Sequence, residues 1–124
     1  TVMIIPHLHF AGTCKEAIEL YEKAFKTKTD EIYMNDENKV SHAVMSIHNQ
    51  IIYLNDRFGA KERTTDISTN LIIVFDNTEE FMYSYEILKE GSKEIDPIST
   101  RPYSSLVVQF IDKYNVQWAF MVKI

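Results

Sequence analysis

Residues 4–26, IIPHLHFAGTCKEAIELYEKAFK, carry the signals that decide the fold. The apolar run at residues 4–10 predicts a strand, and Thr13 with Glu16 three positions later has the spacing of a helix capping box. Apolar residues then recur at the 3, 4, 7 and 8 spacing of one helix face, at Ala17, Leu20, Tyr21, Ala24 and Phe25. We therefore predict a strand followed by a helix over residues 14–26.

The same plan recurs 64 positions later in the chain. A strand is expected at residues 68–74, followed by a helix over residues 78–90 that Asn77 caps and Gly91 ends. The apolar stripe of this helix consists of Phe81, Tyr85 and Leu88. Repetition of a capped helix after an apolar strand indicates an internal duplication of one β-α-β-β-β unit.

Six further strands are expected, three in each half, at residues 31–34, 40–48, 51–55, 93–95, 106–111 and 116–122. Asn49-Gln50 is predicted to make a tight link, Asn115 to adopt a positive φ, and Pro97 to restrict its strand to a sheet edge. The prediction is an α+β fold in a single domain, residues 1–124. It contains module one at about 1–56, a linker at about 57–67 and module two at about 68–124.

Composition and charge exclude several classes of function. The chain of 124 residues is 45% hydrophobic and 25% charged, which is typical of a globular domain. A net charge of −5 without a basic run argues against nucleic acid binding. No apolar stretch approaches the roughly 20 residues that span a bilayer. The beginning of the chain lacks the pattern of a signal peptide, and the single Cys14 cannot form an internal disulfide, so we expect a cytoplasmic location.

Several short motifs occur in a characteristic order: IPHLHFAG at 5–12, EAIELY at 16–21, SHA at 41–43, YLND at 53–56, LKEG at 88–91 and DKYNVQW at 112–118. Together they resemble the PhnB-like family of the glyoxalase/bleomycin-resistance/dioxygenase group, also called the vicinal oxygen chelate superfamily. The resemblance covers nearly the whole chain. It implies paired β-α-β-β-β modules, a half-open, curved mixed sheet with helices on its outer face, and a homodimer.

Members of this family are often labelled 3-demethylubiquinone methyltransferases. The sequence has no glycine-rich loop between a strand and a helix that would hold S-adenosylmethionine, so we do not expect that activity.

The resemblance also implies where a divalent metal would bind. A histidine slot on the first strand falls on Ile5 or Pro6, and a glutamate slot on the last strand falls on Ala119. A slot on the fifth strand falls near Thr69 or Asn70. None of these side chains is a good metal ligand, so we expect the inherited site to be degenerate and no cofactor to be held there.

A relocated metal site is the alternative. His7 and His9 are two positions apart on a predicted strand, so their imidazoles point to the same face. With a third ligand they could hold a divalent metal such as zinc. They could equally line a wet pocket or make one hydrogen bond each.

Alternate positions on the strands supply the residues expected to line a ligand pocket. These candidates are His7, His9, Tyr33, His42, Tyr53, Asn55, Gln117 and Met121. Gln117, Ala119 and Met121 share one face of the last strand, whereas Trp118 and Phe120 are expected to pack beneath the helices. Tyr33, Tyr53 and Asn55 could instead belong to a dimer interface. His42 and His48 are expected to share a face.

Two further residues have alternative interpretations. Cys14 lies in the first turn of a predicted helix, where the helix dipole can lower the pKa of a thiol, or it is a half-buried small residue. Arg101 lies in a predicted loop, where it either binds an anionic ligand or is simply solvated. No catalytic residue can be assigned.

Three functions remain open. The first is a protein that binds or sequesters a small amphipathic or aromatic molecule without a metal. The second is a divalent-metal-dependent lyase, isomerase or dioxygenase that uses a relocated histidine site. The third is a structural or regulatory dimer without a ligand. The missing metal ligands favour the first, and exposed strand edges together with abundant aromatic residues favour a homodimer.

Overall fold

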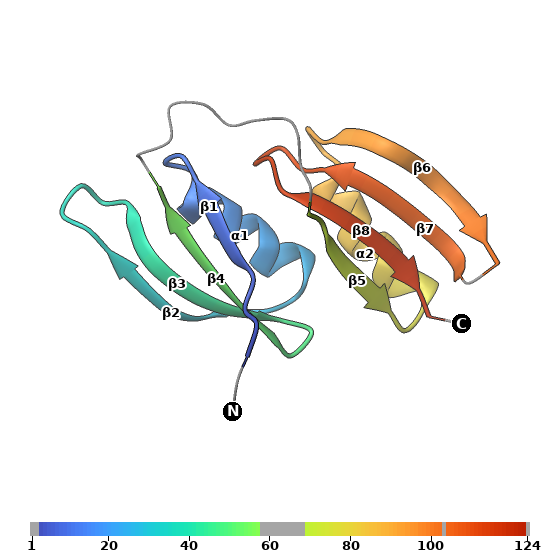
Figure 1. The fold of residues 1–124 in the computed structure, drawn as a ribbon, viewed down its shortest axis with the longest axis horizontal. Coiled ribbons are helices and arrows are strands. Elements are labelled where there is room, and N and C mark those ends of the chain that lie inside the picture. Colours follow the sequence, from blue (N-terminus) through green and yellow to red (C-terminus); the bar gives the residue numbers. More distant parts are fainter. Residues whose placement is uncertain (1–2, 58–68, 103, 124) are drawn as a thin grey trace. The chain divides into compact units, whose positions relative to one another are not determined.

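The computed structural model describes residues 3–57, 69–102 and 104–123, which form two helices and eight strands (Figure 1). The chain divides into two compact units, Thr1–Arg63 and Thr64–Ile124. In each unit one strand, one helix and three further strands follow one another in that order. Neither helix is long and apolar enough to cross a membrane.

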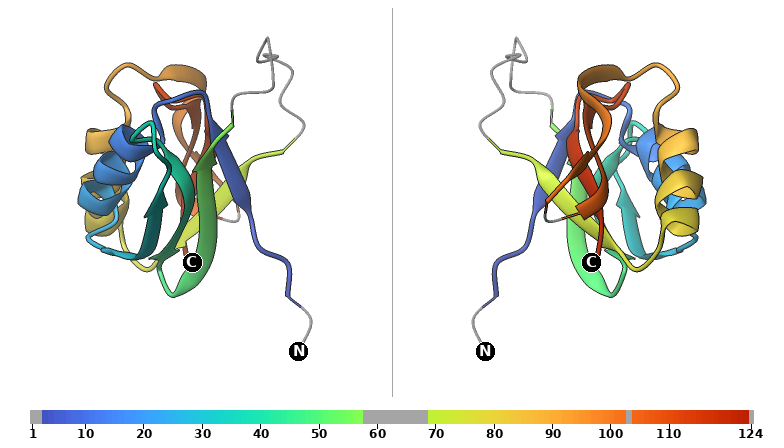
Figure 2. Two further views of the ribbon diagram at one scale, coloured as in Figure 1. Left: turned by 90° about the vertical axis from the view of Figure 1, so that its left-hand side faces the viewer. Right: turned by 90° about the vertical axis from the view of Figure 1, so that its right-hand side faces the viewer.

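The first unit is built on a four-stranded sheet in the order β1-β4-β3-β2. β1 pairs in parallel with β4, and the other neighbours are antiparallel, so the sheet is mixed. The single helix α1 covers one face of this sheet (Figure 2). The elements are β1 (His7–Phe10), α1 (Cys14–Ala24), β2 (Thr29–Met34), β3 (Val40–Ile47) and β4 (Gln50–Asp56).

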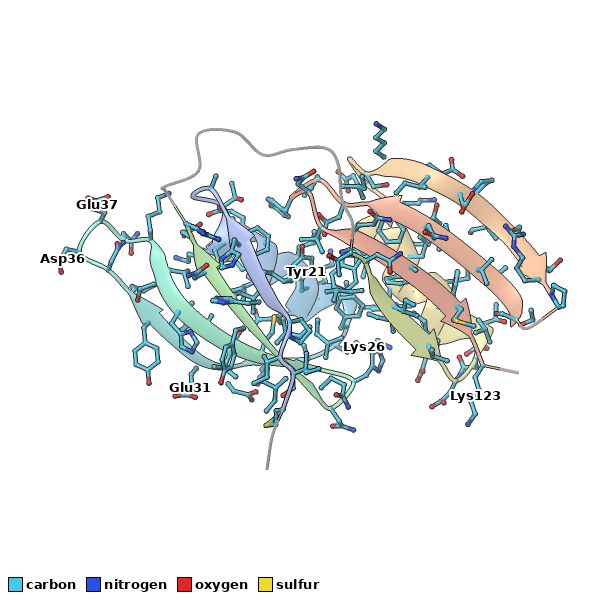
Figure 3. All side chains as sticks on the ribbon, viewed as in Figure 1. Tyr21, Lys26, Glu31, Asp36, Glu37 and Lys123 are labelled. Atoms are coloured by element: carbon cyan, nitrogen blue, oxygen red, sulfur yellow. The ribbon has the colours of Figure 1, made fainter. Side chains whose placement is uncertain are left out.

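The core of the first unit lies between α1 and this sheet. Alternate residues of the strands are buried against the helix, among them Phe10, Met45 and Leu54. Tyr21 on α1 is fully buried, and its ring centroid lies 6.4 Å from those of Phe10 and Phe25 (Figure 3). Burial of each large side chain contributes about 1.5–3 kcal/mol, so this apolar layer holds α1 in place.

The predicted capping box at the start of α1 is wrong. Thr13 occupies the cap position, but its side chain makes no capping hydrogen bond. Asp56, at the end of β4, caps the helix instead. Its Oδ1 accepts hydrogen bonds from the backbone N–H groups of Gly12 and Cys14, at 2.8 and 3.0 Å. A carboxylate from a strand 42 residues away replaces a local hydroxyl, which spacing along the helix could not reveal.

The second unit repeats this arrangement around a sheet in the order β5-β8-β7-β6. β5 is parallel to β8, and the remaining pairs are antiparallel. Both sheets are curved and open, and the predicted α+β architecture of two β-α-β-β-β modules is confirmed (Figure 1). The elements are β5 (Leu71–Phe75), α2 (Thr78–Leu88), β6 (Lys93–Arg101), β7 (Ser104–Ile111) and β8 (Gln117–Val122).

Aromatic side chains dominate the core of the second unit. Trp118 and Phe120 are buried, as predicted for the helix-facing side of the last strand. The ring of Phe120 lies 5.0 Å from that of Phe75 and 6.0 Å from that of Phe81 on α2, both edge to face. The indole Nε1 of Trp118 donates a hydrogen bond of 2.8 Å to the buried carboxylate of Asp112, which satisfies its polar atom.

The start of α2 is as predicted, whereas the helix ends at Leu88, two residues before the predicted end at residue 90. The side chain of Asn77 accepts a hydrogen bond of 2.9 Å from the backbone N–H of Glu80. Beyond the helix, Gly91 has a φ of +72°, in the left-handed region that glycine adopts readily. Asn115 in the last hairpin also has a positive φ, 71°, as predicted.

Several predicted strand limits need correction. The first strand begins only at His7, because Pro6 has no N–H to contribute to a ladder. The link between β3 and β4 is His48-Asn49 and not the predicted Asn49-Gln50. His48 has a φ of 50° and Asn49 a φ of 68°. Two consecutive positive φ values characterise the tight turns that suit a twisted hairpin. His48 therefore leaves the strand and does not share a face with His42.

The strand around Pro97 is longer than the three residues predicted, because β6 extends from Lys93 to Arg101. Its position at the sheet edge is as expected. The pairing register of β6 with β7 shifts between Asp96 and Ser99, the stretch that contains Pro97. The ladder therefore continues past a residue that has no N–H to donate. Residues 58–67 of the predicted linker lie outside the described residues.

The repeat relating the two units is not uniform. Cys14 and Thr78 begin the two helices 64 positions apart, as predicted. On the first strands, however, a shift of 64 pairs buried Phe10 with Val74, which is 55% exposed. Phe10 corresponds instead to buried Phe75, a shift of 65. An alignment error of one residue assigns each side chain of a strand to the wrong face of the sheet. The predicted shift of 64 was therefore right for the helices and wrong for the first strands.

Candidate functional site

Six of the predicted pocket residues lie on the face of the first sheet that points away from α1. Across the sheet, His7 is paired with Tyr53, His9 with Asn55, and Tyr33 with His42. Directly paired residues point to the same side, and the residues between them, such as Leu54 and Ala43, are buried on the helix side. We call this set, His7, His9, Tyr33, His42, Tyr53 and Asn55, the ring face.

The aromatic rings of the ring face form a continuous series across four strands. The centroids of His7 and His9 are 4.3 Å apart, and that of His7 lies 6.1 Å from that of Tyr53. Tyr53 meets His42 edge to face at 4.9 Å, and His42 stacks with Tyr33 at 6.1 Å. Such a layer of planar groups with nitrogen and hydroxyl atoms can stack on a planar ligand and form hydrogen bonds with it.

A hydrogen bond joins Asn55 to the imidazole of His9. Nδ1 of His9 lies 2.7 Å from Oδ1 of Asn55. A carbonyl oxygen only accepts, so Nδ1 of His9 carries a proton and donates in this hydrogen bond. Asn55 therefore fixes the orientation of the His9 imidazole at the β1 edge of the ring face.

The electrostatic environment favours the neutral form of His7. Desolvation lowers the pKa of His7 from its ordinary value, and the positive charges that His9, His42 and Arg57 carry when protonated lower it further. Clustering of basic groups therefore opposes protonation of this imidazole. At the opposite edge, Tyr33 donates a hydrogen bond of 3.0 Å to Glu31, which raises the pKa of the phenol.

The residues of the fold do not fit a divalent metal. Across residues 3–57, 69–102 and 104–123, no group of three or more histidine, cysteine or acidic side chains is placed to hold one. At the positions implied by the resemblance, Ile5, Pro6 and Ala119 have no donor atom in their side chains, and Asn70 directs its amide to Gln109. Among the described residues, no third histidine, cysteine or acidic side chain is placed with His7 and His9 to complete a relocated site.

The two remaining pocket candidates, Gln117 and Met121, lie on β8 in the second unit. They are half-buried and alternate with the buried Trp118 and Phe120, so they lie on the face opposite the core, with Ala119 between them. On this face sequence reasoning missed Gln109 and Asp96, which are joined by a hydrogen bond of 3.2 Å. The only signal for them was their position on strands, because the pairing register brings them together.

Two other candidates are corrected by the structure. Burial raises the pKa of the Cys14 thiol to about 12, with Asp56 and Glu16 adding to the effect, so of the two interpretations the structure supports the small buried residue and not the activated thiol. The thiol is fully buried. Arg101 is the last residue of β6 and does not lie in a loop. Its guanidinium donates a hydrogen bond of 2.7 Å to Ser99.

Comparison with solved structures identifies the fold. The chain resembles a PhnB protein of Bacillus cereus described as a 3-demethylubiquinone-9 3-methyltransferase, with a TM-score of 0.87 and 23% identity over 98% of this chain and 99% of that one. It also resembles protein PA1353 of Pseudomonas aeruginosa, with a TM-score of 0.84 and 20% identity over 99% and 98%. For a glyoxylase/bleomycin resistance protein/dioxygenase domain of Frankia sp. EAN1pec, the TM-score is 0.76 and the identity 15% over 100% and 98%.

No protein-family model matches the sequence, and no curated protein matches it significantly. The structural likeness, at these low identities, establishes the architecture: the chain has the glyoxalase/bleomycin-resistance fold. A fold of this kind supports many chemistries, so function has to be argued from the faces of its sheets.

Proposed function

We propose that this chain is a PhnB-like protein that binds a small planar aromatic molecule on the ring face of its first sheet, without a resident metal. The observation that carries the proposal is the series of four rings, His7, Tyr53, His42 and Tyr33, with successive centroids 4.9 to 6.1 Å apart. Side chains on the opposite face of the same strands already form the core, so packing against α1 does not require these rings.

The chemistry of the ring face favours an aromatic ligand over an aliphatic one. Aromatic pairs gain about 0.5–1.5 kcal/mol beyond the area that they bury. The lowered pKa of His7 favours an imidazole without the hydration shell of a charge. Binding rather than chemistry is proposed, because the metal positions of the fold lack suitable donors.

A homodimer is part of this proposal. β1 is an edge strand of the first sheet and β5 of the second, and both have one side unpaired within their own sheets. Exposed edges are normally covered, and a twofold partner would do so with one self-complementary surface. Sedimentation at micromolar concentration tests this part: a mass near 14.5 kDa that does not change with concentration would contradict it.

NMR titration with a matched pair of compounds tests the binding. The probe is 2-naphthol, and the comparison is decahydro-2-naphthol, which has the same rings saturated and non-planar. The chain has four histidines, and His48 lies in a turn against Phe25, off the ring face. We expect 2-naphthol to shift the imidazole signals of His7, His9 and His42 while that of His48 stays unchanged.

Replacement of the central ring provides the decisive variant. Tyr53→Leu should weaken 2-naphthol binding by about three- to tenfold, the equivalent of one aromatic contact. Tyr83→Leu removes a tyrosine that is 41% exposed on α2 in the other unit and should leave binding unchanged. Equal binding of the saturated compound, or of the Tyr53→Leu variant, would contradict the proposal.

A further inference from the structure

The second sheet carries a polar row of different chemistry on the face opposite α2. The pairing register aligns four residues straight across its strands: Asp96 on β6, Gln109 on β7, Ala119 on β8 and Ile72 on β5. Asn70, two positions before Ile72, reaches toward the same row. Asp96, Gln109 and Asn70 are half-buried, so this row is in contact with solvent without being fully hydrated.

The hydrogen bonds of this row have a fixed direction. Asp96 can only accept, so the nitrogen of the Gln109 amide must face it, at 3.2 Å. Oε1 of Gln109 then faces Asn70, which must present its own nitrogen, at 3.5 Å. Asn70 therefore donates to Gln109, and Gln109 donates to Asp96. The two ends of this hydrogen-bonded series both offer oxygen acceptors, the carbonyl of Asn70 and the carboxylate of Asp96.

Ala119 makes this connection across the sheet feasible. Gln109 lies on β7 and Asn70 directly precedes β5, and β8 runs between these strands. Strands two places apart are separated by roughly 9–10 Å, so the two amides meet above β8. Ala119 lies in this row on β8, and its methyl group leaves the space above the strand to them. Because the Asn70 hydrogen bond is long, it contributes little and a ligand can replace it.

The charge of the row determines what it would attract. Asp96 forms no ion pair with any described residue, and its one hydrogen-bond donor is a neutral amide. The chain as a whole has a net charge of −5. Half-buried acceptors in a row that also contains the apolar Ala119 favour a flat cation whose N–H groups point along the sheet.

We propose that the row formed by Asn70, Gln109 and Asp96 above Ala119 is a binding subsite for a protonated amine or amidine group of a small ligand. The subsite differs in chemistry from the ring face of the first unit and does not depend on the function proposed for it. The cation would bond to the carboxylate of Asp96, and the ligand's apolar part would lie over Ala119, where it would displace the long hydrogen bond between Asn70 and Gln109.

Three compounds of one size test the proposal: benzamidine, which is a cation, benzamide, which is neutral, and benzoate, which is an anion. The side-chain amide groups of Asn70 and Gln109 give their own signals in a proton–nitrogen correlation spectrum, so the site can be observed directly. We expect benzamidine to shift both signals with higher affinity than benzamide, and benzoate to leave them unchanged.

Two variants of β6 that each remove one negative charge, on opposite faces of the strand, are compared as test and control. Asp96→Asn should weaken benzamidine binding by about tenfold or more, the value of one charge-assisted hydrogen bond, and leave benzamide unaffected. Glu94→Gln removes the same charge two positions away, but Glu94 faces the helix side, where it raises the pKa of Tyr85. This variant should bind benzamidine like the wild type.

Filling the space above β8 is a second, independent variant. Ala119→Leu places a larger side chain between the two amides and should abolish the shifts of both signals. Failure of benzamidine to move these signals at millimolar concentration would overturn the proposal, as would equal loss of affinity in Asp96→Asn and Glu94→Gln. Neither outcome bears on 2-naphthol binding at the ring face.

Discussion

Replacement of Asp56 should loosen the first unit of the chain far more than its position at the end of a strand suggests. Its buried carboxylate accepts three backbone hydrogen bonds: from Gly12 and Cys14 at the start of α1, and from Val40 at the start of β3 at 3.0 Å. One side chain therefore joins β4, the helix and β3. Loss of this group leaves the three N–H groups without the hydrogen bonds that the carboxylate provides.

The magnitude follows from the number and kind of these bonds. A hydrogen bond to a charged group contributes about 1.5–3 kcal/mol, but three bonds that share one carboxylate are not independent. Asp56→Asn keeps one oxygen and turns an NH₂ group toward the N–H of Val40, which should cost about 2–3 kcal/mol of unfolding free energy. Asp56→Ala leaves all three N–H groups without the carboxylate and should cost about 3–5 kcal/mol.

The single cysteine and the single tryptophan allow the two units to be followed separately. Cys14 is fully buried in the first turn of α1, so a thiol reagent reaches it only when the first unit opens. Trp118 is buried in the second unit, and its fluorescence reports the unfolding of that unit. Asp56→Asn should accelerate labelling of Cys14 roughly 30- to 150-fold, the equivalent of 2–3 kcal/mol.

Asp36→Asn is the matched control, because Asp36 is exposed at the tip of the hairpin between β2 and β3 (Figure 3). This variant should change the unfolding free energy by no more than about 0.5 kcal/mol. A Cys14 labelling rate in Asp56→Asn equal to that of the wild type would refute the assignment of Asp56 as the cap of α1.

Three further predictions concern pH, backbone conformation and metal content. Because the pKa of His7 is lowered below its unfolded value of about 6.5, the stability that neutral His7 provides is complete above that pH and lost as the pH falls through the folded pKa. Urea unfolding between pH 5 and pH 8 should therefore show a smaller loss on acidification in His7→Asn than in the wild type. Gly91→Ala should cost about 1–2 kcal/mol in the same assay, because φ is +72° and the new Cβ would lie 3.1 Å from Cβ of Lys113, and an unchanged midpoint would contradict this. Protein purified without a chelator or a histidine tag should contain less than one divalent metal per chain by mass spectrometry, and stoichiometric zinc lost in the His7→Ala/His9→Ala double variant would show a relocated site.

The sequence was sufficient to predict the elements and their order because each is encoded locally. Asn77 and Gly91 mark the ends of α2 with residues whose chemistry fits only a few backbone conformations. The alternation around Trp118 and Phe120 shows which face of β8 is buried, since the large aromatic side chains occupy every second position. Such signals act over a few residues and can be recognised without knowledge of the fold.

The features that the sequence analysis assigned wrongly or missed depend on contacts between residues far apart in the chain. The capping carboxylate of α1 comes from the far end of β4, and the polar row of the second sheet exists only in the pairing register of its strands. The ring face is intermediate, because alternation predicted that His7 and His9 share a side. It could not predict that His42 on β3 would meet Tyr53 on β4.

The structural equivalence of the two sheets gives the duplication a functional meaning. With the faces correctly aligned, the row His7, Tyr53, Val44 and Glu31 of the first sheet corresponds to the row Ile72, Ala119, Gln109 and Asp96 of the second. Both rows end in an acidic residue on the outer strand. In the first unit that carboxylate accepts the hydroxyl hydrogen of Tyr33, and in the second it accepts an amide hydrogen of Gln109.

The central positions of these two rows have opposite chemistry. Tyr53 contacts the rings of His7 and His42, whereas Ala119 lies beneath a hydrogen bond between two amides. A large planar side chain and a methyl group cannot recognise the same ligand surface. The repeated scaffold therefore preserves the positions from which side chains point, while the two proposals assign a different ligand group to each face. For this reason Tyr53→Leu should impair naphthol binding but not benzamidine binding, and Ala119→Leu should have the reverse effect.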